Sequence, residues 1–250
     1  MSDVSQAARV QLCGTFAVEL DGRSITRSFR GRQDRMLFTY LVLRGSQAVP
    51  RDALVDALWG EAPPGSPGAA VNVLVSRLRG TLGPELLRGR TEISLVLPQR
   101  AEVDVEIALA AVHTAESAVC TADWPKAWFA ALTAQFVTGR ELLPEAQAPW
   151  LETWRRRLDD VRVRALESYA TACLELGGAE LPAAERAARQ LVDLAPLRET
   201  AHLLLMRALV SAGNTAEALV TYERLRSTLR DELGVDPGPG LQEAYLALLG

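Results

Sequence analysis

The sequence has no long apolar run, and it holds few of the residues on which disulfide, metal and catalytic sites depend. No stretch approaches the roughly 18 consecutive apolar residues that a membrane-spanning helix needs. The segment Met1 to Arg9 is polar and has no hydrophobic core of the kind found in signal peptides. We therefore expect the protein to be cytoplasmic and to make no membrane contact.

Cysteine and histidine are scarce among the 250 residues. Cys13, Cys120 and Cys173 are odd in number and far apart, so neither a disulfide framework nor a C-x-x-C metal clip is predicted. We expect these three to be small core residues. His113 and His202 both lie in helical Ala/Leu runs, which favours a core or groove-edge role over catalysis. No metal or cofactor is expected.

Motifs of known enzyme chemistry are also missing. The spacing suggests no Ser/His/Asp arrangement, and no H-E-x-x-H, EF-hand or zinc pattern occurs. The Gly/Pro-rich segment Gly234 to Gly240 lacks the Lys-Ser/Thr pair of a phosphate-binding P-loop, and the sole lysine, Lys126, is far away in sequence. The sequence therefore predicts that the protein is not an enzyme.

Charge is divided unevenly along the chain, whose net charge is -4. Residues 1–100 carry 13 Arg against 9 Asp and Glu, whereas the remainder carries 14 basic against 22 acidic residues. Only the first part has the positive balance that suits the phosphates of nucleic acid. Because the chain is long enough for two modest cores, we predict two domains, residues 1–100 and 101–250.

Residues 1–100 alternate between strand and helix patterns. The predicted elements are a hairpin from Val10 to Leu20 with the turn Asp21-Gly22 before Arg23-Ser24-Ile25, helices from Met36 to Leu43 and from Arg51 to Trp59, a loop from Glu61 to Gly68, a helix from Ala69 to Arg79, and two short strands between Leu86 and Leu97. Gly45, Pro50 and Gly83-Pro84 mark helix boundaries. Strands, three helices and a terminal hairpin predict a winged helix-turn-helix.

The helix from Ala69 to Arg79 is the most informative segment, because it is amphipathic and carries basic residues. Its buried face is predicted from the helical spacing of Val71, Val75, Leu78 and Leu82. The residues left largely on the other side are Ala70, Val73, Leu74 and Arg77. Leu74 fits either face. This layout is typical of a recognition helix.

From Val103 onward the pattern is almost entirely helical and rich in Ala and Leu. Breaks are predicted at Gly139, Pro144, Gly177-Gly178, Pro196 and Gly213. Pro149 to Leu176 predicts one long helix.

A spacing of 34 residues recurs in this second part. Ala184 and Ala188 are followed at that distance by Ala218 and Tyr222, and an earlier, weaker copy lies at Ala127 and Ala131. This is the tetratricopeptide period, in which stacked helix pairs expose a groove for protein partners. A plain helical bundle with accidental Ala spacing is the alternative.

Two sets of motifs resemble one family of regulators. The first set is Leu54-Val55-Asp56-Ala57-Leu58-Trp59-Gly60, the proline loop, and Val75-Ser76-Arg77-Leu78-Arg79. It resembles the winged-helix domain of OmpR-type regulators, in the variant found in SARP-type antibiotic-pathway activators. The second set is Pro196-Leu197-Arg198-Glu199, Ala212-Gly213-Asn214, Ala216-Glu217-Ala218-Leu219 and Glu232 to Pro239. It resembles the bacterial transcriptional activator domain of that family.

The resemblance runs from about Val10 to the end and implies a mainly α fold. An N-terminal winged helix-turn-helix (α+β) would be followed by an all-α tetratricopeptide-like helical domain. The implied function is sequence-specific transcriptional activation of secondary-metabolite (antibiotic) genes. Two copies would bind tandem direct repeats in double-stranded DNA near the promoter -35 element and recruit RNA polymerase through its sigma factor. Neither a receiver domain nor an ATPase module is expected.

Candidate DNA contacts follow from the helix and from side-chain chemistry. Arg77 suits N7 and O6 of guanine, Arg79 suits a phosphate, and Asn72 suits adenine or caps the helix. Val73 and Leu74 suit thymine methyl groups. The complete set on the helix is Ala70, Asn72, Val73, Leu74, Ser76, Arg77 and Arg79. The expected backbone contacts are Arg30, Arg32, Arg35 and Arg51 near the starts of the first two helices, and Arg88 and Arg90 in the wing.

The wing departs from the family pattern. Relatives usually carry a Pro-Gly-Tyr-like element, whereas this chain has Gly89-Arg90-Thr91-Glu92, and Glu92 would repel phosphate if it faced DNA.

Two other functions stay open: a helical adaptor with a degenerate winged helix, and a ligand-responsive regulator. The latter would use Trp124, Trp128, Trp150 and Trp154 to line a pocket, although interhelical packing explains the same residues.

Overall fold

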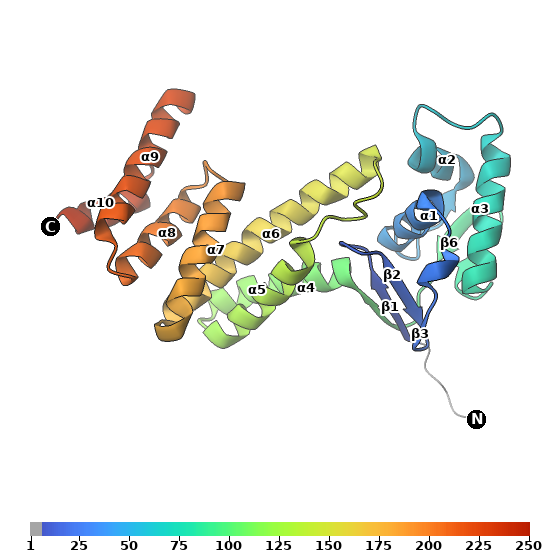
Figure 1. Cartoon of the computed structure of the whole chain (residues 1–250), viewed down its shortest axis with the longest axis horizontal. Helices are drawn as coiled ribbons and strands as arrows, with labels where there is room; N and C mark the ends of the chain where they lie inside the picture. Colours follow the sequence, from blue (N-terminus) through green and yellow to red (C-terminus); the bar gives the residue numbers. More distant parts are fainter. Residues whose placement is uncertain (1–6) are drawn as a thin grey trace. The chain divides into compact units, whose positions relative to one another are not determined.

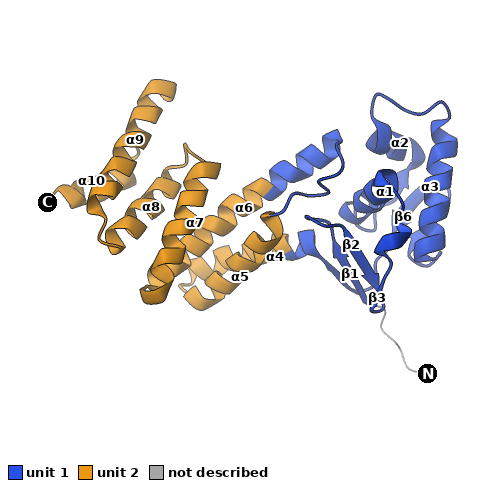
Figure 2. Ribbon diagram, viewed as in Figure 1, with its two compact units in different colours: residues 1–107, 140–158 blue, residues 108–139, 159–250 orange. Residues whose placement is uncertain are grey.

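The computed structural model describes residues 7–250 and shows a mainly helical chain with a small amount of sheet, as the sequence predicts (Figure 1). Most of the polar stretch Met1 to Arg9 lies outside the described residues. The chain divides into two compact units, which Figure 2 draws in different colours. The first unit comprises residues 1–107 and 140–158, and the second comprises residues 108–139 and 159–250.

A four-stranded sheet opens the first unit. Its strands are β1 (Ala7–Gln11), β2 (Ala17–Leu20), β3 (Arg23–Ser24) and β7 (Arg100–Val103), in the order β3-β2-β1-β7. The predicted turn Asp21-Gly22 joins β2 to β3. The segment from Val10 to Leu20 contains a further turn near Gly14, which pairs β1 with β2 and adds a strand to the predicted hairpin. Gly14 has a φ of 76°, which favours glycine.

Strand β7 lies outside the elements that the sequence predicts. It runs parallel to β1, so that Arg9 lies opposite Glu102, which is 93 residues away in sequence. Two of its four residues, Arg100 and Glu102, are charged and exposed. No local pattern marks such a strand, because its pairing is entirely non-local.

A short 3-10 helix, three α-helices and a second sheet follow β3. They are η1 (Thr26–Ser28), α1 (Arg32–Leu43), β4 (Val49–Pro50), α2 (Arg51–Trp59), α3 (Pro67–Leu82), β5 (Leu87–Arg88) and β6 (Glu92–Leu95), and the sheet order is β4-β6-β5. The α-helices and the β5–β6 hairpin coincide with predicted elements, but α1 begins before the predicted Met36 and α3 begins at Pro67, inside the predicted loop. Pro50 caps α2 and Pro67 begins α3, since the first turn of a helix needs no proline N–H.

The core of the first unit lies between these helices and the strands. The rings of Phe16, Phe29 and Phe38 meet edge to face, with centroids 5.0 to 5.9 Å apart. The predicted inner face of α3 is confirmed, since its buried side chains include Val71, Val75, Leu78 and Leu82. Burial of this apolar stripe holds α3 in place and fixes which of its side chains reach solvent.

Residues 140–158 complete the first unit. Leu142 is buried, and the ring of Trp150 packs against Tyr40 with centroids 5.1 Å apart. Trp150 Nε1 also donates a hydrogen bond to the carbonyl oxygen of Ala57 at 2.9 Å. The chain therefore does not divide into its two compact units at a single point near residue 100. Residue 100 stays a prediction of where the DNA-binding part ends.

Helices build the second unit. Two of them, α4 (Asp104–Cys120) and α6 (Pro149–Leu176), begin in the first unit, and the others are α5 (Trp124–Thr138), α7 (Leu181–Leu194), α8 (Glu199–Ser211), α9 (Thr215–Leu233) and α10 (Pro239–Leu249), with a short η2 (Gly178–Glu180). The predicted long helix is confirmed as α6. Within residues 7–250, no helix combines the length and apolar character that crossing a bilayer requires.

Small side chains allow the helices of the second unit to approach closely. Ala184 and Ala188 of α7 and Ala218 of α9 are fully buried, and Tyr222 stacks on Tyr245 at 4.0 Å between ring centroids. Helix α8 packs against both α7 and α9. The 34-residue spacing thus falls on buried positions, while the tetratricopeptide-like character of the unit stays a prediction.

The cysteines divide between core and surface. Cys13 and Cys173 are buried, as expected, but Cys120 is exposed at the last position of α4, which corrects the expectation for that residue. Burial raises the pKa of the Cys13 thiol to about 12 and that of Cys173 to about 11. Both therefore remain uncharged thiols at neutral pH.

Candidate nucleic-acid interface

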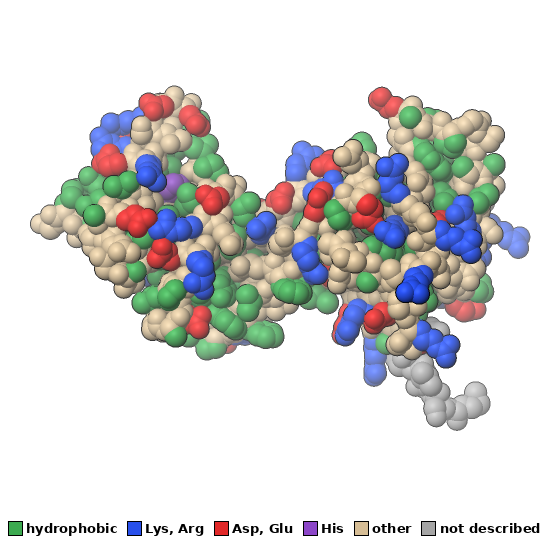
Figure 3. Space-filling view, in the orientation of Figure 1, with side chains coloured by type: hydrophobic (Ala, Val, Ile, Leu, Met, Phe, Trp, Pro, Cys, Tyr) green, Lys and Arg blue, Asp and Glu red, His purple; other side chains and the backbone are tan. Residues whose placement is uncertain are grey.

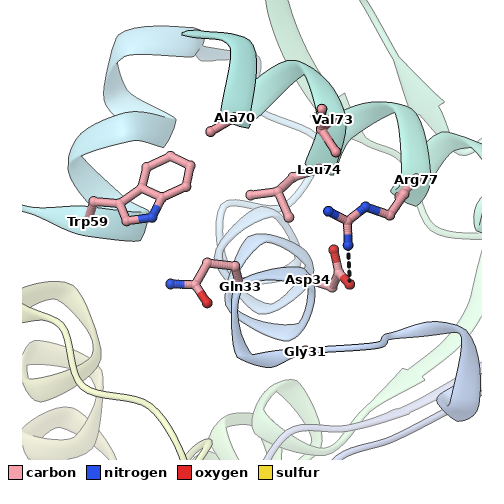
Figure 4. Close-up of a pocket in the computed structure, with 8 residues that line it drawn as sticks. All are labelled: Gly31, Gln33, Asp34, Trp59, Ala70, Val73, Leu74 and Arg77. Atoms are coloured by element: carbon pink, nitrogen blue, oxygen red, sulfur yellow. Dashed lines mark hydrogen bonds and ion pairs between the residues drawn. The ribbon is translucent and has the colours of Figure 1, made fainter. Parts of the chain in front are cut away.

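Helix α3 presents a mixed apolar and basic face to solvent (Figure 4). Its exposed side chains include Asn72, Val73, Ser76 and Arg77, and Ala70 is half-buried. Val73 is 51% exposed, so its methyl groups are accessible to a partner. Leu74 is only 6% exposed and belongs to the packed side of the helix. This corrects its place among the candidate thymine contacts.

A hollow of about 400 Å³ lies beside this face of α3. It is lined by Gly31, Gln33 and Asp34 of the α1 start, Trp59 of the α2 end, and Ala70, Val73, Leu74 and Arg77 of α3. Figure 4 shows the side chains of Asp34 and Arg77 pointing toward each other across it. The hollow is therefore apolar toward α2 and charged toward α1.

Asp34 is a buried carboxylate that pairs with Arg77. Arg77 Nη1 lies 3.4 Å from Asp34 Oδ2, and the two side chains are 48% and 7% exposed, respectively. The same oxygen accepts a hydrogen bond from the backbone N–H of Arg30 at 3.2 Å. Asp34 lies in the first turn of α1, where the helix dipole favours a negative charge. No local sequence signal marks Asp34 as part of the site, because Arg77 is 43 residues away.

Arg79 binds the β5–β6 hairpin rather than pointing freely to solvent. Its Nη2 donates to the carbonyl oxygen of Gly89 at 2.6 Å, and its Nε donates to that of Leu87 at 3.4 Å. In this conformation Arg79 is engaged within the chain and positions the hairpin, while its expected phosphate contact stays a prediction.

Arg51 makes a second connection to the same hairpin. Its Nε donates to the carbonyl oxygen of Arg90 at 2.6 Å, and its Nη1 donates to Asn72 Oδ1 at 2.5 Å. One side chain thus joins the start of α2 to both α3 and the hairpin. This bond uses one lone pair of Asn72 Oδ1, so the second lone pair and the two amide N–H groups remain for an outside partner.

The turn of the hairpin requires glycine at position 89. Gly89 has a φ of 87°, and a Cβ added there would overlap the carbonyl oxygen of Glu92. The side chain of Glu92 is exposed, so this acidic group faces solvent.

The remaining candidate arginines differ in exposure. Arg35 Nη1 pairs with Glu145 at 2.8 Å, and its guanidinium lies 5.6 Å from the Phe16 ring centroid. Arg35 is thus engaged within the first unit, and its expected contact with DNA stays a prediction. The exposed members are Arg30, Arg32, Arg88 and Arg90. On the face drawn in Figure 3, basic side chains of the first unit are interspersed with acidic ones rather than forming one continuous basic surface.

Comparison with known proteins places this chain in a family. The family described as the bacterial transcriptional activator domain matches residues 103–249, which is more than half of the chain. The chain belongs to the SARP-type transcriptional activators. This SARP-type chain is therefore a member of a family of transcriptional regulators, not of enzymes.

Two relatives show how far the likeness extends. The SARP-type chain is 35% identical to the regulatory protein AfsR of Streptomyces coelicolor, in a match that covers 98% of this chain and 24% of AfsR. It is 26% identical to the regulatory protein DnrI of Streptomyces peucetius, over 96% of this chain and 92% of DnrI. The chain thus spans about a quarter of AfsR but nearly all of DnrI.

A solved structure has the same fold as this SARP-type chain. It is described as Mycobacterium tuberculosis EmbR in complex with a low affinity phosphopeptide. The TM-score is 0.82 at 24% sequence identity, and the match covers 98% of this chain and 65% of that one. At this identity the likeness establishes the fold alone.

Proposed function

We propose that the first unit is a winged helix-turn-helix that binds double-stranded DNA with α3 in the major groove. Three features support this: α3 follows two helices, it precedes the β5–β6 hairpin that would be the wing, and its outer face mixes Val73 with the polar Asn72, Ser76 and Arg77. A single helix fits the major groove, where base edges offer both hydrogen-bonding groups and thymine methyls.

The observation that carries the proposal is the exposure of Arg77 on this face. Arg77 would donate two hydrogen bonds to O6 and N7 of guanine, and Val73, one helical turn earlier, would contact a thymine methyl. Arg30 and Arg32 at the start of α1, with Arg88 and Arg90 on the hairpin, would contact phosphates. Arg51 and Arg79 would fix the hairpin against α3 instead.

The proposed consequence of binding is transcriptional activation. Two copies would occupy direct repeats near the -35 element and bring RNA polymerase to the promoter through its sigma factor. Genes of secondary-metabolite (antibiotic) biosynthesis are the proposed targets, and the helices of the second unit, taken as tetratricopeptide-like, would offer a groove to protein partners. Membership of the SARP-type family supports this function.

Selection of bound sequences from random duplex DNA tests the proposal at about physiological salt, where non-specific phosphate binding is screened. The native chain is compared with Arg77→Ala and with Arg23→Ala. Arg23 is an exposed arginine of β3, so its replacement removes the same charge away from α3. We expect the native chain and Arg23→Ala to enrich a repeated motif and Arg77→Ala to lose it.

The other outcomes separate the competing functions. Equal enrichment by the native chain and Arg77→Ala would contradict the base-reading role of Arg77. A native chain that enriches no sequence at all would contradict sequence-specific binding and favour the protein-protein adaptor. A change in Trp fluorescence on adding pathway metabolites would instead support the ligand-responsive regulator.

A further inference from the structure

The guanidinium of Arg77 is held at one nitrogen only. Nη1 pairs with Asp34 at 3.4 Å, and nothing else between residues 7 and 250 lies within hydrogen-bond distance of the Arg77 side-chain nitrogens. Nε and Nη2 form the other edge of the planar group, with two parallel N–H donors. Pairing through Nη1 therefore leaves this two-donor edge free, and two parallel donors match O6 and N7 of guanine.

Asp34 is itself fixed in position. Its side chain is 7% exposed, and its Oδ2 also accepts the backbone N–H of Arg30. Met36 and Leu37, which follow it on α1, are buried in the core at 2% and 0% exposure. A carboxylate held in this way restricts the rotamers of Arg77 before DNA arrives, which reduces the conformational entropy that Arg77 loses on binding.

We propose that Asp34 is a positioning residue that holds Arg77 in its base-reading orientation and so determines how strongly α3 prefers guanine. This inference rests on the proposed DNA-binding function, since it concerns what Arg77 does in the major groove. It adds to that function a residue of α1 that touches no base.

The Asp34 carboxylate has opposite effects on non-specific DNA binding and on binding to the correct sequence. Asp34 offsets part of the charge of Arg77 and adds a negative charge near the phosphates, so it weakens binding to any DNA. By orienting Arg77 it strengthens binding to the correct sequence. Removing the charge should therefore lower discrimination between sequences while leaving or raising the affinity for random DNA. A purely structural role would lower both affinities together.

The experiment measures the affinity of the full chain for three duplexes at one salt concentration. They are the motif selected above, the same motif with adenine in place of the guanine whose enrichment depends on Arg77, and a random duplex. For Asp34→Asn we expect the ratio of the first two affinities to fall about tenfold, the scale of one good base contact. Affinity for the random duplex should stay equal or rise.

Two further variants separate positioning from charge. Asp52→Asn removes an exposed carboxylate from the first turn of α2, and we expect it to keep the native discrimination. In an Arg77→Ala background, Asp34→Asn should cause no further loss of discrimination, because its effect acts through Arg77. An equal further loss in that background would overturn the inference.

Comparison of Arg77→Ala with Asp34→Asn separates DNA reading by Arg77 from positioning by Asp34. If Arg77→Ala loses discrimination and folded Asp34→Asn keeps it, DNA reading by Arg77 stands and positioning by Asp34 is overturned. If Asp34→Asn loses helical circular dichroism, Asp34→Glu replaces it, since this variant keeps the charge but moves the carboxylate by one methylene. We expect Asp34→Glu to lower discrimination without raising affinity for random DNA, and native discrimination in this variant would overturn the inference.

Discussion

At the scale of single residues, the arginines of the first unit differ in what their side chains contact. Arg77 exposes two donors, Arg79 and Arg51 bind carbonyl oxygens of the hairpin, and Arg35 pairs with Glu145. The sequence predicts a basic cluster but not this division. Each role depends on a partner that is distant in sequence, and the partner of Arg35 is 110 residues away. Local pattern therefore locates the candidate site, whereas tertiary packing decides which side chains are free.

Arg79→Ala is expected to loosen the β5–β6 hairpin while the rest of the first unit stays folded. The change removes two hydrogen bonds from a charged donor to the carbonyl oxygens of Leu87 and Gly89, worth about 1–3 kcal/mol in total. Amide hydrogen exchange should accelerate in the hairpin but not in α1. Arg88→Ala is the control, because the Arg88 side chain bonds to the carbonyl oxygen of Glu85, three residues earlier, and not across the hairpin within residues 7–250. Unchanged hairpin protection in Arg79→Ala would contradict this role.

The buried His202 makes the folded chain less stable at low pH than at neutral pH. Burial lowers its pKa, and its Nε2 lies 2.8 Å from the carbonyl oxygen of Pro196. The unfolded chain, with a His pKa of about 6.5, therefore binds more protons than the folded chain just below that pH. The stabilising contribution is present above pH 6.5 or so and is lost as pH falls through the folded pKa.

Urea unfolding at pH 7 and pH 5 measures this effect. We expect the native chain to lose stability at the lower pH and His202→Gln to lose less of it, since glutamine does not titrate. His113→Gln is the matched control, because His113 is the other histidine and its side chain is 69% exposed. If His202→Gln keeps the full pH dependence, the assignment to His202 is wrong.

At the scale of elements, local patterns predict most of the fold. Helices α1, α2, α3 and α6 and the β5–β6 hairpin occur where apolar periodicity, proline and glycine place them. The missed elements depend on distant pairing: β7 exists because it adds to β1, and residues 140–158 pack into the first unit. Leu74 shows the same limit within one helix, since its burial depends on how α3 meets its neighbours.

Gly89→Ala should destabilise the hairpin by about 2 kcal/mol or more, since a side chain at a φ of 87° is strained and its Cβ would overlap the Glu92 carbonyl oxygen. Urea unfolding and affinity for the selected duplex measure the effect. Gly80→Ala in α3 is the control: an added Cβ meets open space there, and alanine favours a helix by about 0.5–1 kcal/mol. A neutral Gly89→Ala would contradict the requirement for glycine.

At the scale of the whole molecule, the two compact units do not correspond to two uninterrupted halves of the chain. Each unit is made of two segments, so the first unit needs residues that follow the predicted DNA-binding part. The family match begins at residue 103 and therefore includes residues 140–158, which stabilise the first unit. A fragment that ends near residue 100 would lack the Trp150 contacts with Tyr40 and Ala57.

Trp150→Ala tests this dependence in the full chain. The change removes ring packing against Tyr40 and a hydrogen bond to Ala57, both in the helices that precede α3, so we expect a loss of about 2–4 kcal/mol in the first unit. Faster amide exchange in α1 and α2 would report it. Trp154→Ala is the matched control, because Trp154 is half-buried and stacks with Arg157 of its own helix. Native exchange rates in α1 and α2 of Trp150→Ala would contradict the stabilising role of Trp150.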